Sequence, residues 1–135
     1  MASRKIKQVI VMRKDLNMRK GKMMAQAAHA CMAFLTKNAV VNDDFWTFTT
    51  GFFPYDFNII KEWLNDGFTK IALQVDNLDE LMDIYTKALN KGMIVSLITD
   101  SGLTEFKGIP TVTCLAIGPV ENEEVDKITG HLKLW

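Results

Sequence analysis

The chain divides into short, almost uninterrupted apolar runs separated by segments with helical periodicity. Four β-branched runs predict strands, at 6–11, 69–75, 94–99 and 111–117. Helical spacing of apolar residues predicts three helices, at about 21–37, 78–91 and 121–129, of which the second has Asn77 and Glu80 as a capping box. Strands that alternate with helices favour an α/β fold with a largely parallel sheet covered on both faces.

The helix predicted over 21–37 carries polar side chains along one line. At about 100° per residue, Lys22, Gln26 and His29 fall within an arc of about 60°. The apolar residues that we assign to the other side are Met23, Met24, Ala27, Ala28, Cys31, Phe34 and Leu35. We therefore expect this helix to pack on the sheet with its apolar side and to present the polar ridge to a cleft.

Composition points to one domain over residues 1–135. The chain is 48% hydrophobic, which suits a single core and leaves little room for a second domain. No stretch is long and apolar enough to cross a bilayer, and the first residues lack a signal-peptide core, so we expect a cytoplasmic protein without a membrane partner. Cys31 and Cys114 lack Cys-x-x-Cys spacing, which predicts two buried, reduced thiols and no metal site.

The charges are unevenly distributed although the formal net charge is zero. Eight of the 16 Lys and Arg residues precede residue 23, where Asp15 is the single acid. A local basic patch can bind phosphates on a neutral protein, because screening confines its field to about 8–10 Å at physiological salt. A solvated basic surface that aids solubility is the alternative.

Several residues are suited to ester chemistry. An ammonium such as that of Lys22 can stabilise the oxyanion that forms when water attacks an ester. Asp100 ends an apolar strand, where a carboxylate can point into a cleft at the sheet edge, although a turn-forming role before Ser101 is equally consistent. Ser101 has no nucleophile elbow around it and His131 has no recognisable triad partner, so water is the expected nucleophile.

Four segments, in the same order over nearly the whole chain, carry a family resemblance. They are 13–30, which contains the run Lys-Gly-Lys-Met-Met-Ala-Gln-Ala-Ala-His-Ala, followed by 95–104, 111–119 and 125–135. Together they resemble the second class of peptidyl-tRNA hydrolase, best known from archaea and eukaryotes. The resemblance implies a three-layer α/β/α sandwich with a four-stranded mixed sheet in which one strand is antiparallel. It also implies a homodimer that uses no metal or organic cofactor.

The function implied by this resemblance is hydrolysis of the ester between a peptide, or an N-blocked amino acid, and tRNA. The residues that match the family's catalytic positions are Lys22, Asp100, Thr104, Thr113 and Gln26. The candidates for binding tRNA are Arg13, Arg19 and Lys20 from the basic segment, and His29. Two alternatives stay open: a non-catalytic module that binds tRNA or a protein, and a hydrolase of D-aminoacyl-tRNA or another small ester.

The chain departs from the family pattern at two places. Leu103 and Glu105 stand where the family usually has Arg and Gln around its Thr, which should weaken a phosphate contact made by that loop. The aromatic segment 45–57 is longer than usual for the family. We expect an irregular connection there, and a partner or dimer surface is the alternative.

Overall fold

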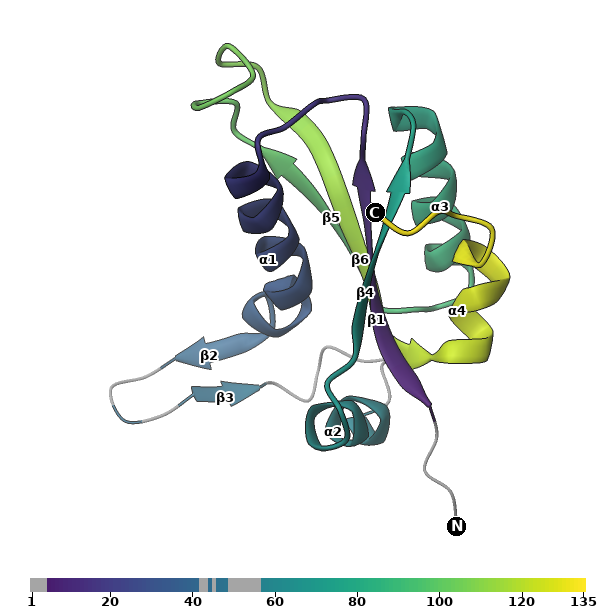
Figure 1. Cartoon of the computed structure of the whole chain (residues 1–135). Coiled ribbons are helices and arrows are strands. Elements are labelled where there is room, and N and C mark those ends of the chain that lie inside the picture. The colour runs from purple at the N-terminus through teal and green to yellow at the C-terminus, as the bar shows by residue number, and fades with distance from the viewer. Residues whose placement is uncertain (1–4, 42–43, 45, 49–56) are drawn as a thin grey trace.

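The computed structural model describes residues 5–41, 44, 46–48 and 57–135 (Figure 1). The helices are α1 (Lys20–Thr36), α2 (Phe57–Asn65), α3 (Leu78–Asn90) and α4 (Asn122–Thr129). The strands are β1 (Ile6–Arg13), β2 (Ala39–Val41), β3 (Trp46–Phe48), β4 (Lys70–Val75), β5 (Val95–Asp100) and β6 (Thr111–Glu121). Strand and helix types agree with the sequence prediction wherever it made one.

The central sheet has four strands in the order β4-β1-β6-β5. β1 pairs in parallel with β4, whereas β6 is antiparallel to both β1 and β5. Three strands therefore point the same way and β6 alone runs against them. The expected mixed sheet with one antiparallel strand is confirmed, but only one of the three neighbouring pairs is parallel. β2 and β3 form a separate antiparallel pair.

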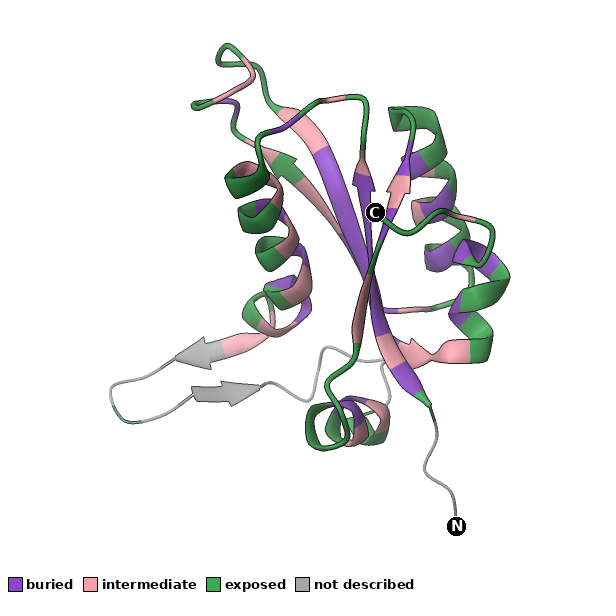
Figure 2. Ribbon diagram, in the orientation of Figure 1, coloured by how far each residue is buried: buried purple, intermediate pink, exposed green. Residues whose placement is uncertain are grey.

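Helices cover both faces of this sheet, which confirms the three-layer α/β/α arrangement (Figure 1). α1 and α2 lie on one face, where Phe34, Ile60 and Trp63 pack together. α3 and α4 lie on the other face, over a larger apolar cluster. Its buried members are Val9, Val11, Leu73, Val75, Leu81, Ile84, Ala88, Leu115, Ile117, Val125 and Ile128. The central strands β1 and β6 are the most buried part of the chain (Figure 2).

The two longest helices begin differently. At α3, the Asn77 side chain accepts a hydrogen bond from the Glu80 amide at 2.9 Å, and the Glu80 carboxylate accepts one from the Asp76 amide at 2.9 Å. This is the predicted cap, and it satisfies amides that a helix start leaves free. α1 has no side-chain cap and no acid in its first turn, and it places Lys20 and Lys22 there. Cations at a helix N-terminus interact unfavourably with the helix dipole, so these two charges destabilise the first turn of α1.

The predicted apolar side of α1 packs on the sheet at Met23, Ala27, Phe34 and Leu35, but it differs from the prediction at two positions. Met24 is 68% exposed and Ala28 is exposed, whereas Gln26 is buried. The polar ridge of α1 therefore faces inward at Gln26, because that side chain finds hydrogen-bond partners on the sheet. Cys114 is buried as predicted, but Cys31 is only partly buried.

The segment predicted as an irregular connection contains regular structure. β3 (Trp46–Phe48) pairs with β2, and α2 begins at Phe57. Residues 49–56 lie outside the described part of the chain. Among the described helices, none combines the length and the apolar character that a membrane crossing needs.

The end of the chain runs along the edge of the sheet at β4. Leu134 forms an antiparallel bridge with Leu73, and the Trp135 amide donates a hydrogen bond to the Ala72 carbonyl at 3.0 Å. The Gln74 amide donates to the Lys133 carbonyl at 3.0 Å. These contacts cover part of the β4 edge and bring Trp135 over the face on which α1 lies.

Candidate functional site

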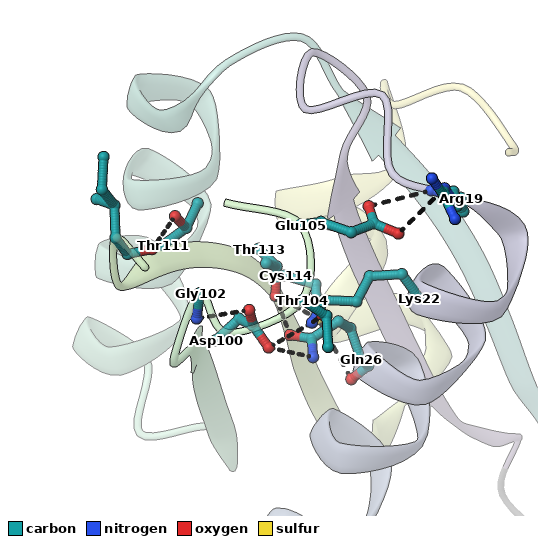
Figure 3. A network of polar contacts seen from close by, with 11 residues as sticks. Arg19, Lys22, Gln26, Asp100, Gly102, Thr104, Glu105, Thr111, Thr113 and Cys114 are labelled. Carbon is teal, nitrogen blue, oxygen red and sulfur yellow. Dashed lines mark hydrogen bonds and ion pairs between the residues drawn. The ribbon is translucent and has the colours of Figure 1, made fainter. Parts of the chain in front are cut away.

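Lys22 and Asp100 meet in an ion pair although 78 positions separate them in the chain (Figure 3). Lys22 lies in the first turn of α1 and Asp100 is the last residue of β5. Lys22 Nζ is 2.7 Å from Asp100 Oδ1 and also donates a hydrogen bond to Thr104 Oγ1 at 2.8 Å. The two charged side chains are 13% and 10% exposed, so the pair is close to solvent but largely enclosed. The fold thus brings together three of the predicted site residues.

Gln26 and Thr113 form the floor beneath this pair. Thr113 Oγ1 donates a hydrogen bond to Gln26 Oε1 at 2.6 Å. Gln26 Nε2 in turn donates to Asp100 Oδ1 at 3.2 Å. Because the hydroxyl occupies the amide oxygen, the amide nitrogen is directed at the carboxylate. Thr113 is fully buried, so in this arrangement it acts on Gln26 and does not reach a substrate.

A β-bulge explains why Thr113 points toward α1. Ile98 pairs with Cys114 and Thr99 pairs with Val112, which leaves Thr113 as an extra residue in β6. A bulge re-aims the side chain of the extra residue, so that Thr113 and Cys114 both face the helix. The Cys114 thiol accordingly lies 3.5 Å from the Gln26 carbonyl. The alternation of an ordinary strand would have placed these two neighbours on opposite faces.

The loop after β5 holds Asp100 from the other side. The Gly102 amide donates a hydrogen bond to Asp100 Oδ2 at 2.9 Å, and the Gly108 amide donates to the Gly102 carbonyl at 2.9 Å. Gly102 has a φ of 85°, and a Cβ there would lie 2.3 Å from the Ile109 carbonyl oxygen. Only glycine fits this close approach. Gly102 therefore allows the two ends of the loop that carries Thr104 to approach each other closely.

Electrostatics keep Asp100 ionised. The hydrogen bond from Lys22 is the largest cause that lowers the pKa of Asp100 below its ordinary value; the Gly102 amide, the charge of Lys22 and the Gln26 amide act in the same direction. Burial of the carboxyl opposes them and is the weaker effect. Burial raises the pKa of the Cys114 thiol to about 11, so this cysteine is a neutral part of the site floor.

The predicted tRNA-binding residues do not join this network as a group. Arg13 pairs with the Asp15 carboxylate at 2.7 Å and donates to the Val112 carbonyl at 3.0 Å, which are contacts within the fold. The Arg19 side chain is 91% exposed. Lys20 and His29 are also exposed, and His29 stays outside the hydrogen-bonded cluster around Lys22.

The basic segment does not form one patch either. Lys7 makes an ion pair of 2.7 Å with Asp126 near the start of β1, while Arg13 ends that strand. A strand of this length spans about 25 Å, which is more than two screening lengths at physiological salt. The exposed cations of the basic segment that lie close to the Lys22 end of the sheet are Lys14, Arg19 and Lys20.

The loop 101–110 contributes Glu105, which the sequence singled out as a departure from the family pattern, and two residues that it did not, Phe106 and Lys107. Glu105 accepts a hydrogen bond from the Arg19 amide at 3.4 Å and its carboxylate lies 4.0 Å from the Arg19 guanidinium, so it neutralises charge at the start of α1. The Phe106 ring centroid is 5.8 Å from Lys22 Nζ. Lys107 is exposed on the same loop, four residues after Leu103, and adds a cation there. A cation within the loop that carries Thr104 was the signal that could have identified Lys107.

Comparison with known proteins shows the family of this chain. The model of the family described as peptidyl-tRNA hydrolase PTH2 matches residues 6–135. The chain belongs to this family. A peptidyl-tRNA hydrolase of Nanoarchaeum equitans is 40% identical over 130 residues, which are 96% of this chain and 99% of that protein. One from Methanocaldococcus jannaschii is 41% identical over 133 residues, with the same two coverages.

A solved structure shares the fold. A protein of unknown function from Agrobacterium tumefaciens, Atu0240, superposes with a TM-score of 0.55 at 15% identity, covering 96% of this chain and 97% of its own. At this identity the likeness concerns the architecture alone. Membership of the PTH2 family confirms the resemblance that the four sequence segments indicated.

Proposed function

We propose that this chain hydrolyses the ester bond between the carboxyl end of a peptide, or an N-blocked amino acid, and the 3′ ribose of tRNA. The observation that supports this most is the network in which Lys22, Asp100, Thr104 and Gln26 converge from α1, β5 and the loop after it. Family membership over residues 6–135 supports the same substrate.

Lys22 stabilises negative charge in this reaction. An ammonium has three N–H donors, and two of them are used by Asp100 and Thr104. The third is left for the ester carbonyl oxygen, which becomes an oxyanion when water adds to the carbonyl carbon. Because Asp100 and Thr104 hold the ammonium before substrate arrives, little reorganisation is needed as the charge develops.

Asp100 acts mainly by holding Lys22. Its Oδ1 accepts hydrogen bonds from Lys22 and Gln26, and its Oδ2 accepts one from the Gly102 amide. A carboxylate with so many donors and a lowered pKa is a weak base, although Oδ2 can still accept a hydrogen bond from a water molecule. Asp100 therefore orients the attacking water and keeps the ammonium in place.

The reaction is balanced with water as the one co-reactant. A C–O bond forms between the water oxygen and the ester carbonyl carbon, and the water proton passes to the surrounding solvent. The tetrahedral intermediate then collapses, the bond to the ribose oxygen breaks, and that oxygen takes up a proton. The products are a peptide carboxylic acid, which ionises to the carboxylate by releasing its proton to solvent, and tRNA with a free 3′ end. The proposed reaction uses no metal or organic cofactor.

The proposed partner is tRNA, held through its phosphates by the exposed cations beside the site. Lys14, Arg19 and Lys20 are exposed there and can contact phosphates without reading sequence. We place the protein in the cytoplasm, where translation occurs, and propose a homodimer on the family resemblance. Light scattering tests the dimer, which has twice the chain mass of 15.3 kDa.

The decisive experiment compares Lys22→Ala with Lys61→Ala. Lys61 is an exposed lysine on α2 and serves as the matched control. With N-acetyl-aminoacyl-tRNA as substrate, we expect Lys22→Ala to lower kcat by about 10²–10³-fold, the usual effect of removing an oxyanion donor. Circular dichroism should show an unchanged fold. Cleavage by Lys22→Ala at the rate of the control would remove Lys22 from the mechanism.

The same assay separates the alternatives. Release of amino acid from unblocked L- or D-aminoacyl-tRNA at a comparable kcat/KM would favour a broader esterase. Salt-sensitive binding of tRNA without any cleavage by the wild-type protein would favour a binding module. The intact network around Lys22 favours catalysis over a binding module, and membership of the PTH2 family favours peptidyl-tRNA over other esters.

A further inference from the structure

An apolar groove lies between α1 and the β4 side of the sheet, next to the proposed site. It has a volume of about 460 Å³ and is lined from α1 by Lys20, Met23 and Met24, from the sheet by Ala72, and by Trp135. We call it the Trp135 groove. α1 covers the sheet over β5, β6 and β1, so the groove opens where the helix layer ends.

The groove walls combine exposed apolar groups with one cation. Met24 is 68% exposed and Trp135 is 48% exposed. Lys20 lines the groove as well, and no residue that lines it has a carboxylate side chain. An aromatic ring and flexible thioethers beside a single ammonium match a ligand with a flat apolar part and a neighbouring negative charge.

The groove begins at the turn of α1 that also carries Lys22. Lys20 and Met23 flank Lys22 in the first turn of α1, so they lie within about 5.4 Å of it along the helix axis. Met23 also packs in the cluster that contains Met12 and Phe106, and Phe106 belongs to the loop that carries Thr104. A ligand in the groove thus lies at the same end of α1 as the proposed site, on the other side of the helix from Asp100.

We propose that the Trp135 groove binds an unpaired nucleotide at the 3′ end of the tRNA substrate. The base lies against Trp135 and Met24, and the adjoining phosphate pairs with Lys20. This proposal rests on the proposed function, because the esterified end of tRNA is a short single strand with exposed bases. Stacking on aromatic side chains and pairing with cations are how proteins bind single strands without reading sequence. An apolar peptide side chain would form no ion pair with the ammonium of Lys20.

A binding experiment tests the groove without any catalysis. The protein is labelled with ¹³C at its methionine methyl groups and titrated with the trinucleotide CCA. We expect the methyl signals of Met23 and Met24 to shift in a saturable way. Met32 is 52% exposed on the same helix but does not line the groove, so its signal should stay in place. Unchanged Met23 and Met24 signals at millimolar trinucleotide would overturn the proposal.

A kinetic experiment uses the same pair of methionines. Met24→Glu and Met32→Glu introduce the same charge at exposed positions of α1. We expect Met24→Glu to raise KM for N-acetyl-aminoacyl-tRNA about tenfold with kcat little changed, since one stacked base contributes about that factor. Met32→Glu should behave as wild type. Trp135→Leu, which keeps an apolar side chain, should raise KM in the same way as Met24→Glu. Equal KM values for the two glutamate variants would contradict a nucleotide in the groove.

The results separate this proposal from the proposed function. If wild-type protein cleaves the ester but CCA leaves the groove signals unchanged, the groove proposal fails and the hydrolase stands. If CCA shifts the signals but no ester is cleaved, the hydrolase fails and the groove stands. Shifts caused by an N-acetyl peptide amide and not by CCA would assign the groove to the peptide. Loss of a dimer in Met24→Glu, with no response to CCA, would assign it to a second copy of the chain.

Discussion

The two faces of the central sheet differ in what they bury. The face under α3 and α4 packs aliphatic side chains against each other, with Leu81, Leu115 and Val125 fully buried. The face under α1 also buries polar groups, among them Gln26 and Thr113, and both belong to the hydrogen-bonded network around Asp100. One sheet thus carries a cohesive apolar layer on one side and a polar, functional layer on the other.

This difference shows how a small domain combines stability with a polar site. Buried polar groups cost free energy unless each has a partner, and the side chains of Gln26 and Thr113 have partners with defined geometry. Aliphatic packing on the opposite face contributes the free energy that offsets the cost of burying these polar groups. Substitutions on the α3 and α4 face should therefore change stability, and those on the α1 face should mainly change kcat.

The largest expected effect is on stability, for Leu115→Ala. Leu115 is fully buried in the cluster under α3 and α4, so truncation should lower the free energy of unfolding by about 2–5 kcal/mol. Urea denaturation measures this change. Leu89→Ala is the control, since Leu89 is 50% exposed on α3 and should change stability by less than about 0.5 kcal/mol. A loss of kcat in the folded fraction of Leu115→Ala would contradict the view that the face under α3 and α4 affects stability and not catalysis.

The next effect is on catalysis, for Asp100→Asn. The substitution keeps the size of the side chain but removes the charge that holds Lys22, so kcat should fall about 100-fold. Initial rates with N-acetyl-aminoacyl-tRNA give the measurement. Asp83→Asn removes one partner of an exposed ion pair with Lys87 on α3 and should leave kcat unchanged. Equal kcat values for both variants would show that the ion pair of Asp100 is as dispensable as that of Asp83.

A smaller effect is expected for Thr113→Val. Valine has nearly the same shape but cannot donate to Gln26 Oε1, so the amide is no longer directed at Asp100. We expect kcat to fall about tenfold and stability to fall by about 1–2 kcal/mol, because a buried acceptor loses its donor. Thr113→Ser, which keeps the hydroxyl, should recover most of the kcat. If serine and valine give the same kcat, the hydroxyl has no positioning role.

The smallest effect concerns pH. The pKa of Asp100 is lower in the folded protein than the value of about 3.9 of an unfolded chain. The pair with Lys22 therefore stabilises the fold fully above about pH 4, and this contribution is lost as pH falls through the lower, folded pKa. Between about pH 5 and 8 we expect no change from this group in kcat/KM or in the urea midpoint. An acidic limb near neutrality that disappears in Asp100→Asn would mean that Asp100 titrates as a base.

Much of the fold could be predicted because its signals are local. The cap at Asn77, the apolar runs of the four central strands and the end of β5 at Asp100 are each written in a few neighbouring residues. α2 had a local signal too, since Ile60 and Trp63 follow a helical spacing, but the aromatic residues before it obscured where the helix begins.

The parts that sequence did not predict depend on contacts between distant segments. Whether Gln26 faces inward depends on Thr113, which lies 87 positions away. Thr113 in turn points toward α1 because a bulge in β6 shifts its register against β5, and no pattern in the strand itself indicates that shift. The site residues were found by matching family positions, whereas the roles of Gly102 and Glu105 needed the folded loop.

The pairing of residues 133–135 with β4 has a consequence for self-association. An uncovered border strand offers free amides and carbonyls to any other extended chain and so invites aggregation. Here residues 133–135 occupy those groups at Ala72 and Gln74, so the molecule covers part of one edge of its own sheet. A fusion tag placed after Trp135 has to leave this tail free to dock, or the preparation will tend to precipitate.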